Sequence, residues 1–202
     1  MVEPLFCNID DKSIVYRFVS NLFHVCTYFI VDELKVIIVD PGKLNDNVCK
    51  WLLQFNEIDK IIYVTHEHFD HHFDVNLLLG YQRTSLYLHT DGFADAIFNP
   101  RTNLSHFYDM SVETKSNHRS ILNFFEVIET PGHSGHSCCF RYKNLLFGGD
   151  TVIENKYLVF KLPGGDKSKF KESVIKLREI TESDTIVLPG HGGIFDFDKW
   201  IT

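Results

Sequence analysis

The sequence lacks the features that mark membrane, secreted and nucleic-acid-binding proteins. No run approaches the roughly 18 apolar residues of a membrane helix, and segment 1–11 is too polar for a secretory signal. Lys and Arg total 20 against 27 Asp and Glu, and no basic stretch is long enough to follow a phosphate backbone. We therefore expect a cytoplasmic protein whose partners include neither a membrane nor a nucleic acid.

Cysteine pairs of the kind used for zinc or redox chemistry are also missing. The odd set of five contains no Cys-x-x-Cys motif and comprises Cys7, Cys26, Cys49, Cys138 and Cys139. We expect reduced, mostly buried thiols. Strand alternation favours ordinary core positions for the neighbours Cys138 and Cys139, although one of the two could face a site.

The bulk composition is that of a globular protein, with 44% apolar and 23% charged residues. A chain of 202 residues can bury one sizeable core and leaves little room for a second. The sequence shows no tandem repeat and no low-complexity linker. We therefore predict one domain spanning residues 1–202.

Hydrophobic periodicity alternates along the chain between the patterns of strands and helices. Strands are predicted at 14–19, 23–31, 34–39, 60–64, 85–88, 124–129, 137–141, 144–147 and 185–188. Helices are predicted at 44–55, 75–80, 91–98 and 167–180, and the segment 101–119 is polar. This order indicates an α/β fold with helices covering the faces of sheets.

Four of the eleven histidines are concentrated in one short motif, His66-Glu67-His68-Phe69-Asp70-His71-His72, directly after a predicted strand. Two histidines at positions i and i+2 of an extended loop project to one side and can hold one ion. The Asp-His pair that follows can be directed at a second ion. The alternative is a polar loop in which Asp70 and Asp74 cap helices.

Three later strand ends combine glycine with a residue type that binds metals. They are Pro131-Gly132-His133, Gly148-Gly149-Asp150 and Pro189-Gly190-His191. Glycine lets the backbone approach an ion closely. Each motif alone is explained as well by a turn residue or a helix cap, but their joint order favours a metal centre.

In this order, the four motifs resemble those of the metallo-β-lactamase superfamily over most of the chain. Asn103-Leu104-Ser105 and the segment 162–166, Leu-Pro-Gly-Gly-Asp, are similar to the short hydroxyacylglutathione hydrolases of the glyoxalase II-like branch. The resemblance implies a four-layer αββα sandwich with its site at one edge of the paired sheets.

The resemblance also implies a role for each candidate ligand. The first metal would take His66, His68 and His133; the second would take Asp70, His71 and His191; Asp150 would bridge both. Asp40, in Asp40-Pro41-Gly42, would orient a ligand histidine, and its alternative is a plain turn residue. Asp70 and Asp150 are thus the candidate catalytic residues.

Imidazole and carboxylate ligands favour zinc and leave iron and manganese open. Two such ions lower the pKa of water from about 15.7 towards about 7 and supply a hydroxide. We expect this hydroxide to attack the carbonyl of a small-molecule acyl thioester, whose thiolate leaves without acid help. A lactone or a phosphodiester is an alternative substrate, because the metal ligands do not determine which of these substrate classes is cleaved.

Substrate recognition is the point at which the sequence departs from its apparent relatives. Residues 158–161 replace the usual Gly-Arg-Thr-Asp, so the Arg is missing, and Phe73-Asp74 replaces a Gly-Gly. The sequence therefore leaves glutathione binding open. Candidate substrate contacts are His72, His136, Lys156, Tyr157 and Lys161, each of which could equally serve packing, hydrogen bonding or solvation.

Three rival functions are compatible with the same fold. A mononuclear iron persulfide dioxygenase would use fewer ligands, and the number of bound metals separates it from a dinuclear hydrolase. An oxygen-reducing diiron protein is disfavoured by His68, where those proteins have Glu. A non-catalytic metal-binding module is disfavoured by the complete set of seven ligands.

Overall fold

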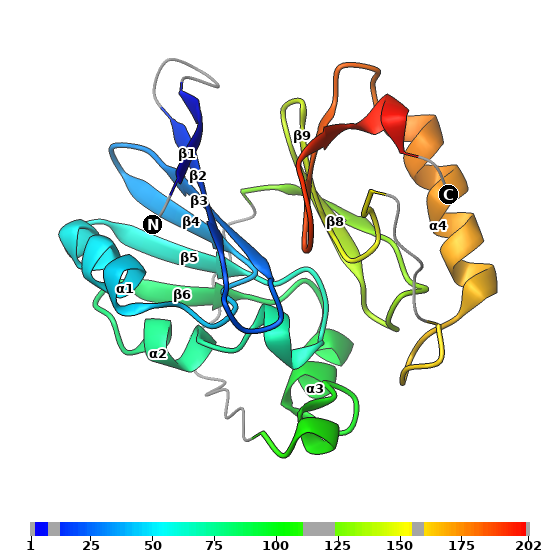
Figure 1. Cartoon of the computed structure of the whole chain (residues 1–202), viewed down its shortest axis with the longest axis horizontal. Coiled ribbons are helices and arrows are strands. Elements are labelled where there is room, and N and C mark those ends of the chain that lie inside the picture. Colours follow the sequence, from blue (N-terminus) through cyan, green and yellow to red (C-terminus); the bar gives the residue numbers. More distant parts are fainter. Residues whose placement is uncertain (1–2, 8–12, 111–123, 155–159, 201–202) are drawn as a thin grey trace. The chain divides into compact units, whose positions relative to one another are not determined.

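The computed structural model describes residues 3–7, 13–110, 124–154 and 160–200 (Figure 1). The chain divides into two compact units, each of which is described by itself below. The first unit comprises Met1–Val64, Asp70–Leu88 and Glu113–Leu122, and the second comprises Thr65–Phe69, His89–Val112 and Asn123–Thr202. The expectation of a single domain stays a prediction.

The first unit is built on a mixed sheet of six strands in sequence order. Its strands are β1 (Glu3–Cys7), β2 (Ile14–Val19), β3 (Cys26–Val31), β4 (Lys35–Val39), β5 (Asp59–Tyr63) and β6 (Thr84–Tyr87). The pairs from β1 to β4 are antiparallel, whereas β4–β5 and β5–β6 are parallel. Parallel neighbours need crossover connections, and two helices provide them.

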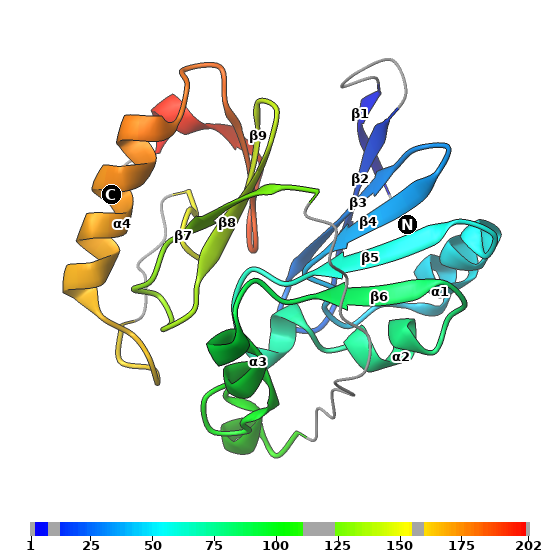
Figure 2. The same ribbon diagram turned by 180° about the vertical axis from the view of Figure 1, so that it is seen from behind.

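These helices, α1 (Asp46–Leu52) and α2 (Val75–Leu79), lie along one side of the sheet (Figures 1 and 2). Successive right-handed crossovers in one direction place both helices on the same face. On α1, Trp51 packs edge-on against Tyr16 and Phe29, with ring centroids 5.2 Å apart in each pair. The Asn45 side chain caps α1 by accepting from the Val48 amide.

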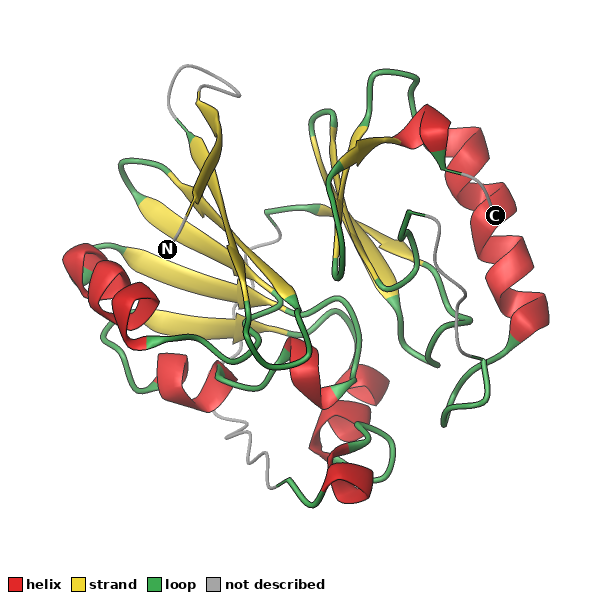
Figure 3. Cartoon of the chain, in the orientation of Figure 1, coloured by secondary structure: helices red, strands yellow, loops and turns green. Residues whose placement is uncertain are grey.

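The second unit is built on a mixed sheet of five strands in the order β11-β10-β9-β8-β7. Figure 3 distinguishes strands, helices and loops by colour. Its strands are β7 (Glu126–Glu129), β8 (Cys138–Tyr142), β9 (Leu145–Gly149), β10 (Ile186–Pro189) and β11 (Phe195–Asp196). Only the β9–β10 pair is parallel among these strands. The unit also contains α3 (Asp91–Phe98) and α4 (Lys167–Ile180).

Helix α4 covers this sheet with the apolar face that its sequence predicted. Phe170, Val174 and Leu177 join one buried cluster with Cys139 and Val187 of the sheet. The two units therefore consist of mixed sheets with flanking helices, and the α/β prediction is confirmed. Among the described residues, no helix is long and apolar enough to cross a membrane.

The predicted elements agree with the structure except at a few boundaries. Strand β3 begins at Cys26 rather than at Phe23, because Phe23 and His24 adopt left-handed backbone angles (φ 61° and 56°) that end strand geometry. Strands β1 and β11 were not predicted. Among the cysteines with described side chains, Cys26, Cys138 and Cys139 are buried and Cys49 is partly buried, and none of the four forms a disulfide bond.

Candidate metal centre

Three buried histidines of the second unit converge on one point. His66 Nε2 and His133 Nε2 each lie 3.1 Å from His68 Nδ1. The three ring nitrogens lie within 4.8 Å of one another and could hold a metal ion. His66 and His68 come from the loop after β5, and His133 comes from the loop after β7.

The spacing of these nitrogens suits a small divalent cation. Metal–nitrogen bonds of about 2.0–2.1 Å in a tetrahedron place neighbouring nitrogens about 3.3–3.4 Å apart. The two separations of 3.1 Å are close to that edge length. Neutral imidazoles that direct nitrogen atoms at a common point provide lone pairs for such an ion, so the donors fit a metal.

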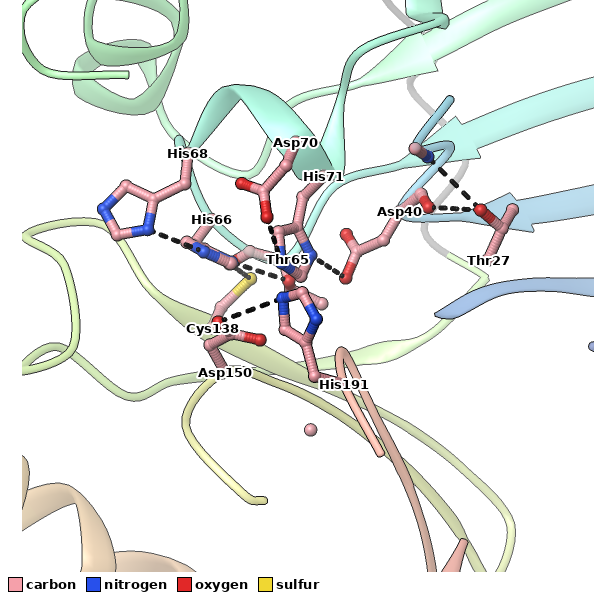
Figure 4. A network of polar contacts seen from close by, with 12 residues as sticks. Thr27, Asp40, Thr65, His66, His68, Asp70, His71, Cys138, Asp150 and His191 are labelled. Atoms are coloured by element: carbon pink, nitrogen blue, oxygen red, sulfur yellow. Dashed lines mark hydrogen bonds and ion pairs between the residues drawn. The ribbon is translucent and has the colours of Figure 1, made fainter. Parts of the chain in front are cut away.

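Thr65 and Gly149 fix the position of His66. Thr65 Oγ1 lies 3.1 Å from His66 Nδ1, which leaves Nε2 directed at His68 (Figure 4). The Thr65 carbonyl accepts a hydrogen bond from the Cys138 amide at 2.8 Å, which ties the loop to β8. Gly149 has φ +49°, and a Cβ there would lie 2.4 Å from Thr65 Oγ1, so only glycine fits.

The loop that carries His133 is held by tight backbone packing. Gly132 has φ +140°, and a Cβ there would lie 2.4 Å from the Phe170 backbone on α4. The Gly132 carbonyl accepts a hydrogen bond from the Asp166 amide at 2.8 Å. Asp166 also caps α4 by accepting from the Ser168 and Lys169 amides. The Leu-Pro-Gly-Gly-Asp segment therefore packs against a ligand loop.

Asp150 lies between the three-histidine group and His191. Its Oδ2 is 3.6 Å from His133 Nε2 and 3.5 Å from His191 Nε2. Asp150 follows β9, and His191 follows β10, so the parallel pairing of these strands places both residues at the same end of the sheet. A carboxylate between two imidazoles is suited to bridging two cations.

The first unit holds a second group of predicted residues, which Figure 4 also labels. His71 Nδ1 donates a hydrogen bond to Asp40 Oδ2 across 3.0 Å, and His71 Nε2 lies 3.8 Å from Asp70 Oδ2. The Asp40 carboxylate thus keeps the proton on Nδ1 and leaves the Nε2 lone pair on the side of Asp70. Both His71 and Asp40 are buried.

Asp40 is itself held in an unusual backbone conformation, with φ 50°. Thr27 Oγ1 donates to the Asp40 carbonyl at 2.8 Å and accepts from the Gly42 amide at 3.2 Å. Asp74, the other residue considered as a helix cap, makes no capping bond to α2. It accepts instead from the Leu44 amide at 2.7 Å and from Lys43 Nζ at 3.0 Å.

The candidate substrate contacts are placed differently from one another. His72 is fully buried, His136 is partly buried and Lys161 is exposed. The His136 ring packs against α3, where a Cβ at Gly92 would lie 3.0 Å from its Cε1. Lys156 and Tyr157 lie outside the described residues.

Sequence reasoning missed several supporting residues, because their partners are distant in the chain. Asn103 is buried, donates to the Ile97 carbonyl and accepts from the Phe69 amide with its own carbonyl at 2.8 Å. It thereby holds the turn that follows His68. The sequence indicates Asn103 only through the family resemblance of Asn-Leu-Ser, and it gives no local signal for Thr65, Glu67 or Ser134.

The sequence matches a protein-family model over most of its length. The model of the Metallo-beta-lactamase superfamily matches residues 21–191. The chain belongs to the metallo-beta-lactamase superfamily. Its two mixed sheets with flanking helices are the metallo-beta-lactamase fold, which confirms the predicted fold class.

Two curated relatives illustrate the range within this superfamily. A "probable metallo-hydrolase" of Streptococcus pyogenes serotype M6 is 27% identical over 88% of this chain and 83% of its own length. A hydroxyacylglutathione hydrolase of Hydrogenovibrio crunogenus is 28% identical over 79% of this chain. The chain spans about half of that second relative, because the match covers 54% of its length.

A solved structure supports the fold. The B3 metallo-beta-lactamase BLEG-1 matches with a TM-score of 0.77 and 24% identity, covering 92% of this chain and 95% of its own.

Proposed function

We propose that this chain is a metal-dependent hydrolase that uses two divalent ions, zinc by preference, to cleave an acyl thioester. The observation that carries the proposal is the position of Asp150 Oδ2 between His133 and His191. A carboxylate placed in this way can bind one ion beside the three histidines and share a second with His191. The streptococcal relative is named a probable metallo-hydrolase, which agrees with this class of function.

The second ion would take Asp70 and His71 in addition to His191. This part of the proposal rests on the chain sequence and the superfamily, since Phe69 alone separates His68 from Asp70. Within the first unit, Asp40 already orients His71 so that Nε2 carries the lone pair. Asp70 and Asp150 would remove two of the four positive charges and leave an electrophilic site.

Bound metals of this kind activate water near neutral pH and stabilise the oxyanion of an attacked carbonyl. A thioester suits such a site because its leaving group is a thiolate, and thiols have a pKa of about 8.5. The thiolate therefore leaves without a proton donor, unlike the alkoxide of an ordinary ester. The hydroxyacylglutathione hydrolase among the relatives, named for a thioester substrate, supports this choice.

The test combines metal analysis with a substrate panel. The protein is expressed with zinc, iron and manganese available, its metals are counted, and turnover is measured on S-lactoylglutathione, other acyl thioesters, a homoserine lactone and a phosphodiester. We expect about two metals per chain and preference for a thioester. A metal-free preparation would overturn the metal centre; preference for the lactone or phosphodiester would overturn the substrate class alone.

Asp150→Ala gives the matched residue test. We expect fewer than two metals per chain. Turnover should fall by more than about 100-fold, which exceeds the loss expected when a residue that only hydrogen-bonds a metal ligand is removed. Asp184→Ala removes an exposed carboxylate of the same unit and should leave both quantities unchanged. Equal behaviour of the two variants would contradict the bridging role.

A further inference from the structure

Glu67 stands between two candidate ligands, His66 and His68, and is itself fully buried. A carboxylate is rarely placed in the interior unless it is paired or hydrogen-bonded, because desolvation of its charge is costly. The Glu67 carboxylate bonds to Ser134, whereas the His66 and His68 rings meet each other and His133, so Glu67 is not part of the three-nitrogen group. Neither the proposed chemistry nor the ligand set uses this residue.

The partner of Glu67 belongs to the other ligand loop of the same unit. Ser134 Oγ donates a hydrogen bond of 2.5 Å to Glu67 Oε2. This length is typical of a charge-assisted hydroxyl–carboxylate bond. Ser134 directly follows His133, so the bond joins the loop after β5 to the loop after β7.

Ser137 completes the connection on the His133 side. Its Oγ lies 2.7 Å from Ser134 Oγ and accepts a hydrogen bond from the Ser134 amide at 3.1 Å. Ser134 and Ser137 are both buried. Hydrogen bonds among buried groups are little weakened by water, and they hold the Ser134 hydroxyl in one orientation.

We propose that Glu67 is a positioning residue for the first metal site, because through Ser134 it sets the distance between His133 and the His66–His68 pair. This inference rests on the proposed function, since it presumes that the three histidines bind a metal. Glu67 would also contribute a buried negative charge near a group of three uncharged imidazoles. Both effects increase the affinity for a cation.

Two substitutions separate the hydrogen bond from the charge. Glu67→Gln keeps the size of the side chain and an acceptor oxygen but removes the charge. Ser134→Ala removes the hydrogen bond and leaves the charge in place. Ser173→Ala is the matched control, since the buried Ser173 on α4 also hydrogen-bonds the loop before His133, from its Oγ to the Pro131 carbonyl at 2.8 Å.

The readout is metal binding by the full chain, measured by competition with a chromophoric zinc chelator and by the visible spectrum of the cobalt-substituted protein. We expect Glu67→Gln and Ser134→Ala each to weaken one of the two binding events by about 10–100-fold and to change the cobalt spectrum. Ser173→Ala should lower thermal stability while changing affinity by less than about threefold. In Glu67→Gln/Ser134→Ala, the two losses should be less than additive.

Each result decides the question. Wild-type affinity in both Glu67→Gln and Ser134→Ala would overturn the inference and leave the proposed function intact. An equal loss in Ser173→Ala would also overturn it, because any loosening of the loop would then suffice. A wild-type chain that binds no metal would instead overturn the proposed function. If the double variant does not fold, the two single variants decide alone.

Discussion

His71 Nδ1 and Asp40 Oδ2 form a buried hydrogen bond of 3.0 Å between the turn after β4 and the short 3₁₀ helix Phe69–His71. An ionised carboxylate can only accept, so the bond fixes which nitrogen of His71 is protonated. The Asp-Pro-Gly motif is thus more than a turn, because its first residue orients a candidate ligand.

Removal of this carboxylate should weaken metal binding without removing a ligand. We expect Asp40→Ala to reduce metal affinity and thioester turnover by about 10–100-fold, with Asp40→Asn between it and the wild type. Metal content and kcat/KM are the measurements. Asp74→Ala removes another buried carboxylate of the same unit and should lower stability but not affinity. Equal losses of metal affinity in Asp40→Ala and Asp74→Ala would argue against an orienting role for Asp40.

The close approach of Gly149 to Thr65 predicts that alanine substitutions at two glycines will differ in their effect on stability. Gly149→Ala places a Cβ 2.4 Å from Thr65 Oγ1 at φ +49°, so we expect it to lower the free energy of unfolding by about 2–4 kcal/mol. Gly193→Ala has nothing within 4 Å of the new Cβ and should be nearly neutral. Urea denaturation of the metal-free proteins compares them, and similar midpoints would contradict this explanation.

Metal removal should destabilise the folded chain, because the ligands meet only when it is folded. An ion present at 100 times its Kd contributes about 2.7 kcal/mol per site. For a chain of this length, chelation should therefore lower Tm by about 5–10 °C per site lost. Differential scanning fluorimetry with and without a chelator measures the shift. Asp150→Ala should respond less than the wild type; an equal response would place the bound metal elsewhere.

A partly buried histidine outside the set of candidate ligands predicts a loss of stability in acid. Burial, together with the neighbouring His136, lowers the pKa of His89 to about 4. The unfolded chain, with a His pKa of about 6.5, then binds more protons than the folded chain between these values. Stability is therefore present above about pH 6.5 and is lost as the pH falls towards about 4.

The lowering of the His89 pKa corresponds to a contribution on the order of 3 kcal/mol to the pH dependence of the free energy of unfolding. His89→Gln cannot titrate and should flatten this part of the pH dependence relative to the wild type. Urea midpoints of the metal-free proteins between pH 4 and 7 measure the difference. If the urea midpoints of the two proteins change with pH by the same amount, His89 does not contribute to the loss of stability in acid.

The sequence was a reliable guide wherever short-range patterns decide the structure. The apolar positions Phe170, Val174 and Leu177 recur at helical spacing, and α4 buries them as predicted. The candidate ligands could be chosen because histidine and aspartate at glycine-rich strand ends have few other uses in such a combination. Strand β1 was missed because its five residues, Glu-Pro-Leu-Phe-Cys, include a proline and show no clear alternation.

Long-range partners could not be read from local patterns in the sequence, and the orienting role of Asp40 was predicted only through the family resemblance, without its partner. Glu67 and Ser134 are 67 residues apart, and His71 and Asp40 are 31 apart, so no local periodicity relates them. The types of the candidate ligands and their order are thus properties of the sequence. The tertiary structure alone decided which hydroxyls, carboxylates and glycines surround those ligands, because such contacts arise only when separate strand ends are brought together by sheet pairing.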